Sequence, residues 1–167
     1  FGAYLYIGSN LPDHRNYSFI ETSKIYSTDG VKIGELFQTD PTVRRTVVPI
    51  GELPIFVVDA VLAAEDGGFY QHKGLDYFGM FRAFYKMVTR GKISGGGSTI
   101  TQQTVKNMLL THEKKFERKF KELILARRLE SSLTKDEILN IYLNIIYLGH
   151  GRNGIEEAAQ FYFGVPA

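Results

Sequence analysis

The chain has 167 residues, which suits a single domain, and apolar residues make up 44% of it while charged residues make up 23%. This is the composition of a globular protein, so an intrinsically disordered chain is excluded. Without cysteine the chain has neither disulfides nor thiolate metal sites, and no apolar run approaches the roughly 20 residues that span a bilayer. The net charge of +2 says little about partners.

The first 50 residues have the pattern of strands. Two strand-like runs, Tyr17–Tyr26 and Val31–Phe37, flank turn residues at 28–30, and this spacing predicts a β-hairpin. The chain opens on Phe1 rather than Met, which indicates a piece of something longer. The part before it could be a membrane anchor, a signal peptide or another domain, and composition does not choose among them.

Helical periodicity follows Pro54. The pattern predicts helices over Ile55–Asp66, Asp76–Arg90, Ser98–Leu110, Phe116–Leu133 and Ile155–Phe163, and another that opens on a capping box at Thr134 and ends near Gly149. The sequence therefore predicts a mainly α fold with a small β element at its start.

Two adjacent carboxylates, Glu65 and Asp66, end the first of these helices, and Gly67, Gly68 and His72 follow them. Adjacent helical positions point about 100° apart, so we expect the two carboxylates to have different tasks. One would face a cleft while the other orients loop backbone or basic side chains. A polar helix terminus without a function explains the same residues, and the pattern alone leaves that alternative open.

A glycine-rich stretch at residues 95–97 leads into the helix that Ser98 can cap. Backbone N–H groups at such a helix start bind phosphate oxygens well, and the Thr and Gln residues that follow suit the recognition of hydroxyls or amides. The stretch is not a nucleotide-binding P-loop, because no Gly-Lys-Ser/Thr follows it. A flexible connector is the alternative.

Positive charge concentrates between Gln102 and Arg128, where eight basic and three acidic residues give about +5 and leave about −3 for the rest. Within this segment Arg118 and Lys119 lie one helical turn before Glu122, so the three share a face. A solvated salt-bridge face is one interpretation. The other is a buried group that binds an anion, such as phosphate, pyrophosphate, nucleic acid or anionic lipid.

Three further patterns are less specific. Residues 149–154 match the glycine spacing of a dinucleotide-binding loop, but a helix rather than a strand precedes them. The four histidines are scattered without ligand spacing, so we expect no all-histidine metal site. The helix Tyr77–Arg90 mixes aromatic and basic residues, which suits either a membrane surface or an ordinary core helix with snorkelling cations.

Together these segments resemble the bacterial peptidoglycan glycosyltransferases, glycosyltransferase family 51, which includes monofunctional enzymes and the polymerising domain of class A penicillin-binding proteins. Five family motifs occur in family order over roughly residues 44–167. They comprise Glu65-Asp66 with Phe69, His72 and Gly74; Gly96 through Gln103; Arg118-Lys119 with Glu122; Ile138-Leu139 with Tyr142-Leu143-Asn144; and Gly149, Gly151, Gly154 and Ile155 running on to Tyr162-Phe163-Gly164.

The resemblance implies a lysozyme-like, mainly α domain with a membrane-associated jaw subdomain. It implies polymerisation of lipid II into β-1,4-linked glycan strands, with inversion at the donor anomeric carbon and release of undecaprenyl diphosphate, as part of cell wall biogenesis. The GlcNAc 4-hydroxyl of lipid II would attack the growing lipid-linked chain. The implied partners are lipid II, that growing chain, membrane lipids, and a fused transpeptidase domain or other cell-wall synthesis proteins, with no nucleic acid.

The resemblance also implies roles for individual residues. Glu65 would be the catalytic base and Glu122 a second catalytic carboxylate, with a divalent cation (Mg²⁺ or Mn²⁺) near Glu122 and no organic cofactor. The substrate-binding residues would be Asp66, His72, Ser98, Thr99, Gln102, Gln103, Lys106, Arg118 and Lys119. The membrane-facing residues would be Phe78, Phe81, Phe84 and Tyr85.

The family's domain continues beyond its last motif, so we expect residues 51–167 to be a glycosyltransferase catalytic domain truncated at its C-terminal end. We expect residues 1–50 to be a linker and hairpin segment that follows a missing membrane anchor. The implied location is the inner (cytoplasmic) membrane, with the domain on its extracytoplasmic face. The alternatives are a lytic glycosidase with Glu65 as general acid and a non-catalytic membrane scaffold. The basic cluster around Lys106–Glu122 argues against the glycosidase, because the substrate of a glycosidase carries no pyrophosphate.

Overall fold

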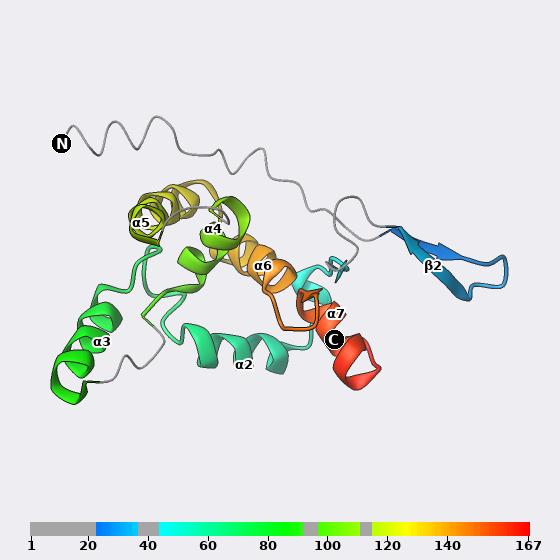
Figure 1. Cartoon of the computed structure of the whole chain (residues 1–167), viewed down its shortest axis with the longest axis horizontal. Helices are drawn as coiled ribbons and strands as arrows, with labels where there is room; N and C mark the ends of the chain where they lie inside the picture. Colours follow the sequence, from blue (N-terminus) through cyan, green and yellow to red (C-terminus); the bar gives the residue numbers. More distant parts are fainter. Residues whose placement is uncertain (1–22, 37–43, 92–96, 111–114) are drawn as a thin grey trace.

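The computed structural model describes residues 23–36, 44–91, 97–110 and 115–167, and their elements are mainly helical (Figure 1). The strands are β1 (Ser23–Tyr26), β2 (Lys32–Leu36), β3 (Arg44–Arg45) and β4 (Arg152–Asn153). The helices are η2 (Ile50–Glu52), α2 (Ile55–Glu65), α3 (Tyr77–Arg90), α4 (Ile100–Leu109), α5 (Lys115–Ser132), α6 (Lys135–Ile145) and α7 (Ile155–Phe163). The predicted mainly α fold is confirmed.

Helices α4, α5 and α6 pack against one another and supply most of the core. Figure 1 shows α2 running alongside them, with α3 at one end of the molecule and the β1–β2 hairpin projecting at the other. Each fully buried aliphatic or aromatic side chain in such a core contributes about 1.5–3 kcal/mol. The core comprises Leu53, Val58, Phe69, Ile100, Val105, Leu110, Leu125, Leu129, Ile138, Leu139, Tyr142 and Leu143.

Capping boxes explain where α4 and α6 begin. The Thr99 hydroxyl accepts a hydrogen bond from the Gln102 backbone N–H, and the Gln102 side chain accepts one from the Thr99 N–H. Thr134 and Glu137 form the same reciprocal pair at the start of α6. The box at Thr134 was predicted, whereas the cap of α4 is Thr99 rather than the predicted Ser98. Helix α6 also ends at Ile145, earlier than predicted.

The predicted hairpin is present, because β1 and β2 pair antiparallel. Residues 1–22 and 37–43 lie outside the described residues, so the outer parts of both predicted strands are not tested. The Lys24 ammonium lies 3.7 Å from a carboxylate oxygen of Glu157. This ion pair connects the hairpin to α7.

The segment before α2 is held against the C-terminal part of the chain. Strand β3 pairs in parallel with β4. Beyond it, the Asn144 carboxamide accepts from the Val48 N–H at 2.8 Å and donates to the Val48 carbonyl at 2.9 Å, while the Asn140 oxygen accepts from the Ile50 N–H at 2.8 Å. Two side chains of α6 therefore satisfy backbone groups that a further strand would otherwise pair.

Candidate active site

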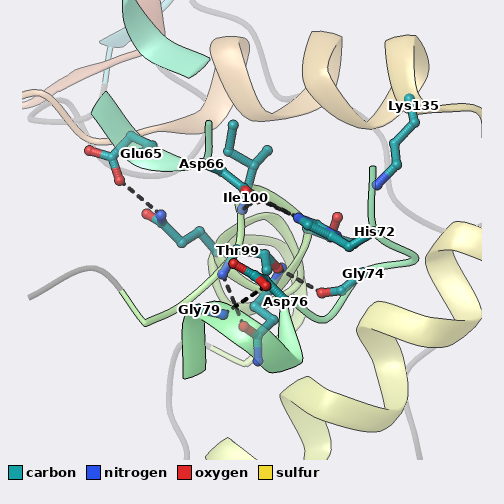
Figure 2. A network of polar contacts seen from close by, with 12 residues as sticks. Glu65, Asp66, His72, Gly74, Asp76, Gly79, Thr99, Ile100 and Lys135 are labelled. Atoms are coloured by element: carbon teal, nitrogen blue, oxygen red, sulfur yellow. Dashed lines mark hydrogen bonds and ion pairs between the residues drawn. The ribbon is translucent and has the colours of Figure 1, made fainter. Parts of the chain in front are cut away.

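Asp66 joins the end of α2 to the start of α4 (Figure 2). It is the C-cap residue of α2 and is only 7% exposed. Its carboxylate accepts from the Ile100 backbone N–H at 3.0 Å, and both of its oxygens lie 3.0 Å from Nε2 of His72. A carboxylate at a helix N-terminus satisfies an otherwise unpaired N–H and is favoured by the helix dipole. Asp66 is thus the carboxylate of the pair that orients backbone, as one of the two was expected to do.

Glu65 lies differently, although it is the neighbouring residue. It is exposed, and its Oε2 accepts from Nε2 of Gln103 at 2.9 Å. Figure 2 shows its carboxylate directed away from the one of Asp66. The two adjacent acids of the motif therefore occupy a solvent-accessible and a buried position.

Two polar cavities meet at Glu65. The loop-side cavity, of about 630 Å³, lies between the loop after α2 and the start of α3. The cation-side cavity, of about 270 Å³, lies between α4 and α5. Both cavities are lined by Glu65, Gly97 and Ser98. The cation-side cavity is also lined by Gln102, Gln103, Lys106 and Glu122. The other residues that line the loop-side cavity are Asp66, Gly67, Gly68, Gln71, His72, Asp76, Phe78, Gly79, Met80, Arg82 and Thr99.

Glu122 is buried beside the cation-side cavity, with 3% of its surface exposed. Its Oε2 lies 2.8 Å from Nζ of Lys119, and its Oε1 lies 3.5 Å from Nε of Arg118. Lys119 also donates to the Ser98 hydroxyl at 2.9 Å. The carboxylate of the group is therefore buried, whereas the side chains of Arg118 and Lys119 remain 30% and 46% exposed. The three cations Lys106, Arg118 and Lys119 outnumber the two carboxylates Glu65 and Glu122 in and beside the cavity, so the net charge there is positive and favours an anionic ligand.

Gln102 has an unused donor in the same cavity. The residue is 1% exposed, and its Oε1 accepts from the Thr99 N–H at 3.0 Å. Its Nε2 is buried and has no hydrogen-bond partner among the described residues. Leaving a buried donor unsatisfied costs about 1–3 kcal/mol. A ligand oxygen in the cation-side cavity would satisfy it.

Thr99 is engaged within the protein, although it borders the loop-side cavity. Its hydroxyl donates to the Gly74 carbonyl at 2.7 Å, and the residue is 3% exposed. Gly74 has a φ of +83° and packs so closely on α5 that an added Cβ would lie 3.0 Å from the Ala126 carbonyl oxygen. Only glycine fits both conditions, so this contact fixes the loop between α2 and α3.

The residues around Glu122 do not fit a protein-held divalent cation. Each of its oxygens already faces Lys119 or Arg118. In the part of the chain that the structure describes, no group of three or more His, Asp or Glu side chains could hold a metal ion. Mg²⁺ needs oxygen ligands rather than ammonium neighbours. The positive charge that Glu122 organises comes from side chains.

Helix α3 exposes aromatic side chains along its length. Phe78 is 76% exposed and Phe81 is 68% exposed, and Tyr77 and Tyr85 are exposed as well. The side chain of Phe84, the remaining predicted membrane-facing residue, lies outside the described part of the structure. No described helix is both long enough and apolar enough to cross a membrane.

The start of α3 is fixed by specific contacts. Asp76 accepts from the Gly79 N–H at 2.8 Å, and a Cβ on Gly79 would lie 2.1 Å from the other Asp76 oxygen. Arg127 of α5 donates to the Tyr77 hydroxyl at 2.8 Å. Helix α3 is therefore attached to α5, the helix that carries Arg118, Lys119 and Glu122.

Sequence reasoning did not include Tyr142 among the site residues. Tyr142 is fully buried on α6, and its hydroxyl donates to Oε1 of Gln103 at 3.4 Å. Burial raises the pKa of Tyr142, and the negative charges of Glu65 and Asp66 raise it further. In the sequence it is one apolar position of a helix, and no local signal connects it with Gln103.

An exposed carboxylate thus lies where two polar cavities meet, with basic side chains beside one of them. The chain belongs to the transglycosylase family, whose model matches residues 29–167.

The chain is also similar to penicillin-binding proteins of several bacteria. It is 44% identical over 168 residues to penicillin-binding protein 1A of Pseudomonas aeruginosa, an alignment that covers 99% of the chain and 20% of that protein. It is 42% identical over 154 residues to penicillin-binding protein 4 of Bacillus subtilis, covering 92% of the chain and 24% of that protein. It is 48% identical over 139 residues to penicillin-binding protein 1A of Neisseria gonorrhoeae, covering 83% of the chain and 17% of that protein. The chain thus spans about a fifth of the length of these relatives.

Proposed function

We propose that the chain is a peptidoglycan glycosyltransferase domain that polymerises lipid II into β-1,4-linked glycan strands. The reaction inverts the donor anomeric carbon and releases undecaprenyl diphosphate. Membership of the transglycosylase family supports glycan transfer, and the similarity to penicillin-binding proteins supports a role in cell-wall synthesis. The observation that carries the proposal is the position of Glu65, at the junction of the loop-side and cation-side cavities.

Glu65 acts as the general base. A GlcNAc 4-hydroxyl of lipid II, bound in the loop-side cavity, transfers its proton to the Glu65 carboxylate while its oxygen bonds to the donor anomeric carbon. The bond between that carbon and the diphosphate oxygen breaks, and its electron pair leaves with the diphosphate. A positioned base contributes about 10²–10⁴-fold to such a step. The exposure of Glu65 supports this role, because the base must reach a substrate hydroxyl.

The leaving diphosphate lies in the cation-side cavity. Lys106, Arg118 and Lys119 stabilise its developing negative charge, as preorganised cations do at other phosphate leaving groups. Glu122 holds the last two of these cations in place from its buried position. Nε2 of Gln102, which has no partner among the described residues, donates a hydrogen bond to an oxygen of the glycosyl-donor substrate.

A lipid-linked substrate requires the domain to work at a membrane surface. The exposed aromatic side chains of α3 would enter the interface, as part of a jaw subdomain, with Arg82 towards lipid headgroups. This arrangement fits a catalytic domain at residues 51–167 on the extracytoplasmic face of the inner membrane. A fused transpeptidase domain or other cell-wall synthesis proteins would act beside it.

Polymerisation of labelled lipid II by the full-length protein in detergent tests the proposal. We expect polymer from the wild type and a rate at least about 100-fold lower from Glu65→Gln. The unfolding temperature should not change, because Glu65 is exposed. Glu52→Gln is the matched control, since Glu52 is also exposed but lines neither cavity.

Two outcomes would contradict the proposal. A Glu65→Gln variant with the wild-type rate would exclude Glu65 as the base. A wild type that makes no polymer but digests preformed peptidoglycan would instead support the lytic glycosidase.

A further inference from the structure

A chain of side chains connects the buried core to Glu65. The Tyr142 hydroxyl donates to Oε1 of Gln103 at 3.4 Å, and Nε2 of Gln103 donates to Oε2 of Glu65 at 2.9 Å. The three residues come from α6, α4 and α2. A tyrosine with no solvent exposure is thereby linked to an exposed carboxylate at the junction of two cavities.

The carboxamide of Gln103 has a donor end and an acceptor end, whereas an ionised carboxylate can only accept. Gln103 therefore stabilises ionised Glu65 only when its amide nitrogen faces that residue. The reversed amide would bring its oxygen against the carboxylate, where two partial negative charges repel. Something must select between these two orientations, which differ by a half turn of the amide.

The Tyr142 hydroxyl makes that selection. Burial, the largest cause, and the nearby acids raise the pKa of Tyr142, so the phenol keeps its proton at neutral pH. A protonated hydroxyl in this place donates to the amide oxygen, and it would lose this acceptor if the amide reversed. The amide nitrogen is consequently left facing Glu65.

We propose that Tyr142 is a positioning residue for glycosyl transfer, which holds Gln103 with Nε2 towards Glu65 and so keeps the Glu65 carboxylate aimed at the junction of the two cavities. It touches neither substrate. The inference rests on the proposed function, because it takes Glu65 as the general base.

Tyr142 also belongs to the hydrophobic core, so a purely structural role must be separated from positioning. A packing role predicts lower stability when the side chain changes, with a loss of rate only as folded protein is lost. A positioning role predicts a kinetic change in a variant whose ring and packing are retained. Tyr142→Phe removes only the hydroxyl and meets this requirement.

The test measures polymerisation of labelled lipid II by the full-length protein. For Tyr142→Phe we expect kcat to fall about three- to tenfold, the effect of one hydrogen bond, and KM to stay within about twofold. A fall in kcat with an unchanged KM is the expected result for a misaimed base, because substrate binding does not depend on Tyr142. Unfolding temperatures of both proteins, measured in parallel, report on packing.

A double-mutant cycle with Gln103→Met shows whether Tyr142 acts through Gln103. If it does, the double variant has the rate of Gln103→Met alone within about twofold, because the intermediary is already absent. If Tyr142 acts independently, the two losses multiply, and that result overturns the proposal.

Tyr70→Phe is the matched control. It also removes a phenol hydroxyl that donates to a side chain, here to Oδ1 of Asp136 at 2.8 Å rather than to an amide oxygen. Tyr70 lines neither cavity. Its kcat should equal that of the wild type. A Tyr142→Phe variant with a wild-type kcat contradicts the positioning role while leaving the proposed function intact. A wild type without polymerase activity removes both.

Discussion

Two regions of the molecule place polar and apolar side chains in opposite ways. At the start of α4 the buried residues are polar, and Thr101, Gln102 and Thr104 are at most 1% exposed. On α3 large apolar side chains are exposed, with Phe78 at 76% and Phe81 at 68%. Each region alone departs from the usual arrangement of an amphipathic helix.

The difference lies in what satisfies these side chains. On α4 the partners are within the protein, since Thr101 donates to Glu130 at 2.6 Å and Thr104 to the Ile100 carbonyl at 2.9 Å. On α3 no described residue covers the exposed rings. A polar core with internal hydrogen bonds fixes the geometry that chemistry needs, whereas an uncovered aromatic face needs an apolar environment from outside.

The comparison is sharpest for a pair of phenylalanines. Phe69 is 1% exposed, and Phe78 is 76% exposed. We expect Phe69→Ala to lower the free energy of unfolding by about 3–5 kcal/mol, because it leaves a cavity in the core. Phe78→Ala should change it by no more than about 0.5 kcal/mol. Denaturant unfolding of both variants measures this, and equal losses would show that α3 packs against something in the free protein.

The aromatic face of α3 can be tested for membrane binding. We expect the double variant Phe81→Ser with Tyr85→Ser to bind anionic phospholipid vesicles at least about tenfold more weakly, because each inserted ring contributes about 1.5–3 kcal/mol at full burial. The matched control is Tyr147→Ser with Phe163→Ser, which removes two aromatic side chains of similar exposure away from α3. Vesicle co-sedimentation that falls equally for both pairs would show that α3 has no special role.

The smallest effect concerns Tyr70, whose hydroxyl donates to Asp136. Partial burial, followed by this hydrogen bond, raises the pKa of Tyr70 from 10.0 to about 12. A group with a raised pKa in the folded state contributes stability that is fully present below the unfolded value of 10.0 and is lost as pH rises towards about 12. Solvent screens this contribution, because Tyr70 is 54% exposed.

Thermal unfolding of the wild type and Tyr70→Phe, followed across this alkaline range, measures the difference. The wild type should lose more of its unfolding temperature than the variant as pH rises. Parallel curves would show that the hydrogen bond to Asp136 does not persist in solution.

Much of the candidate site follows from local patterns in the sequence. The helix end at Glu65, the carboxylate pair, the capping box at Thr134 and the shared face of Arg118 and Glu122 each depend on residues within one or two turns of each other. The cap of α4 was misplaced by one residue, because Ser98 and Thr99 are both good caps and only the backbone decides between them.

Other features depend on tertiary packing and could not be predicted from the amino-acid sequence alone. The spacing of Arg118, Lys119 and Glu122 is the same on a solvated face and on a buried one, so the 3% exposure of Glu122 had no sequence signal. Tyr142 reaches Gln103 across 39 positions, and its hydrogen bond is invisible to helical periodicity.

The hydrogen bonds from α6 to the segment before α2 also have a consequence for synthesis. Val48 and Ile50 find their partners on Asn144 and Asn140, which follow 96 and 90 positions later. At about 5–20 residues per second, roughly 5–20 s pass between the synthesis of Val48 or Ile50 and the synthesis of the asparagine that binds it. During that interval the segment that enters α2 has no α6 to hold it, so we expect Glu65 to reach its place between the cavities only after α6 has been synthesised.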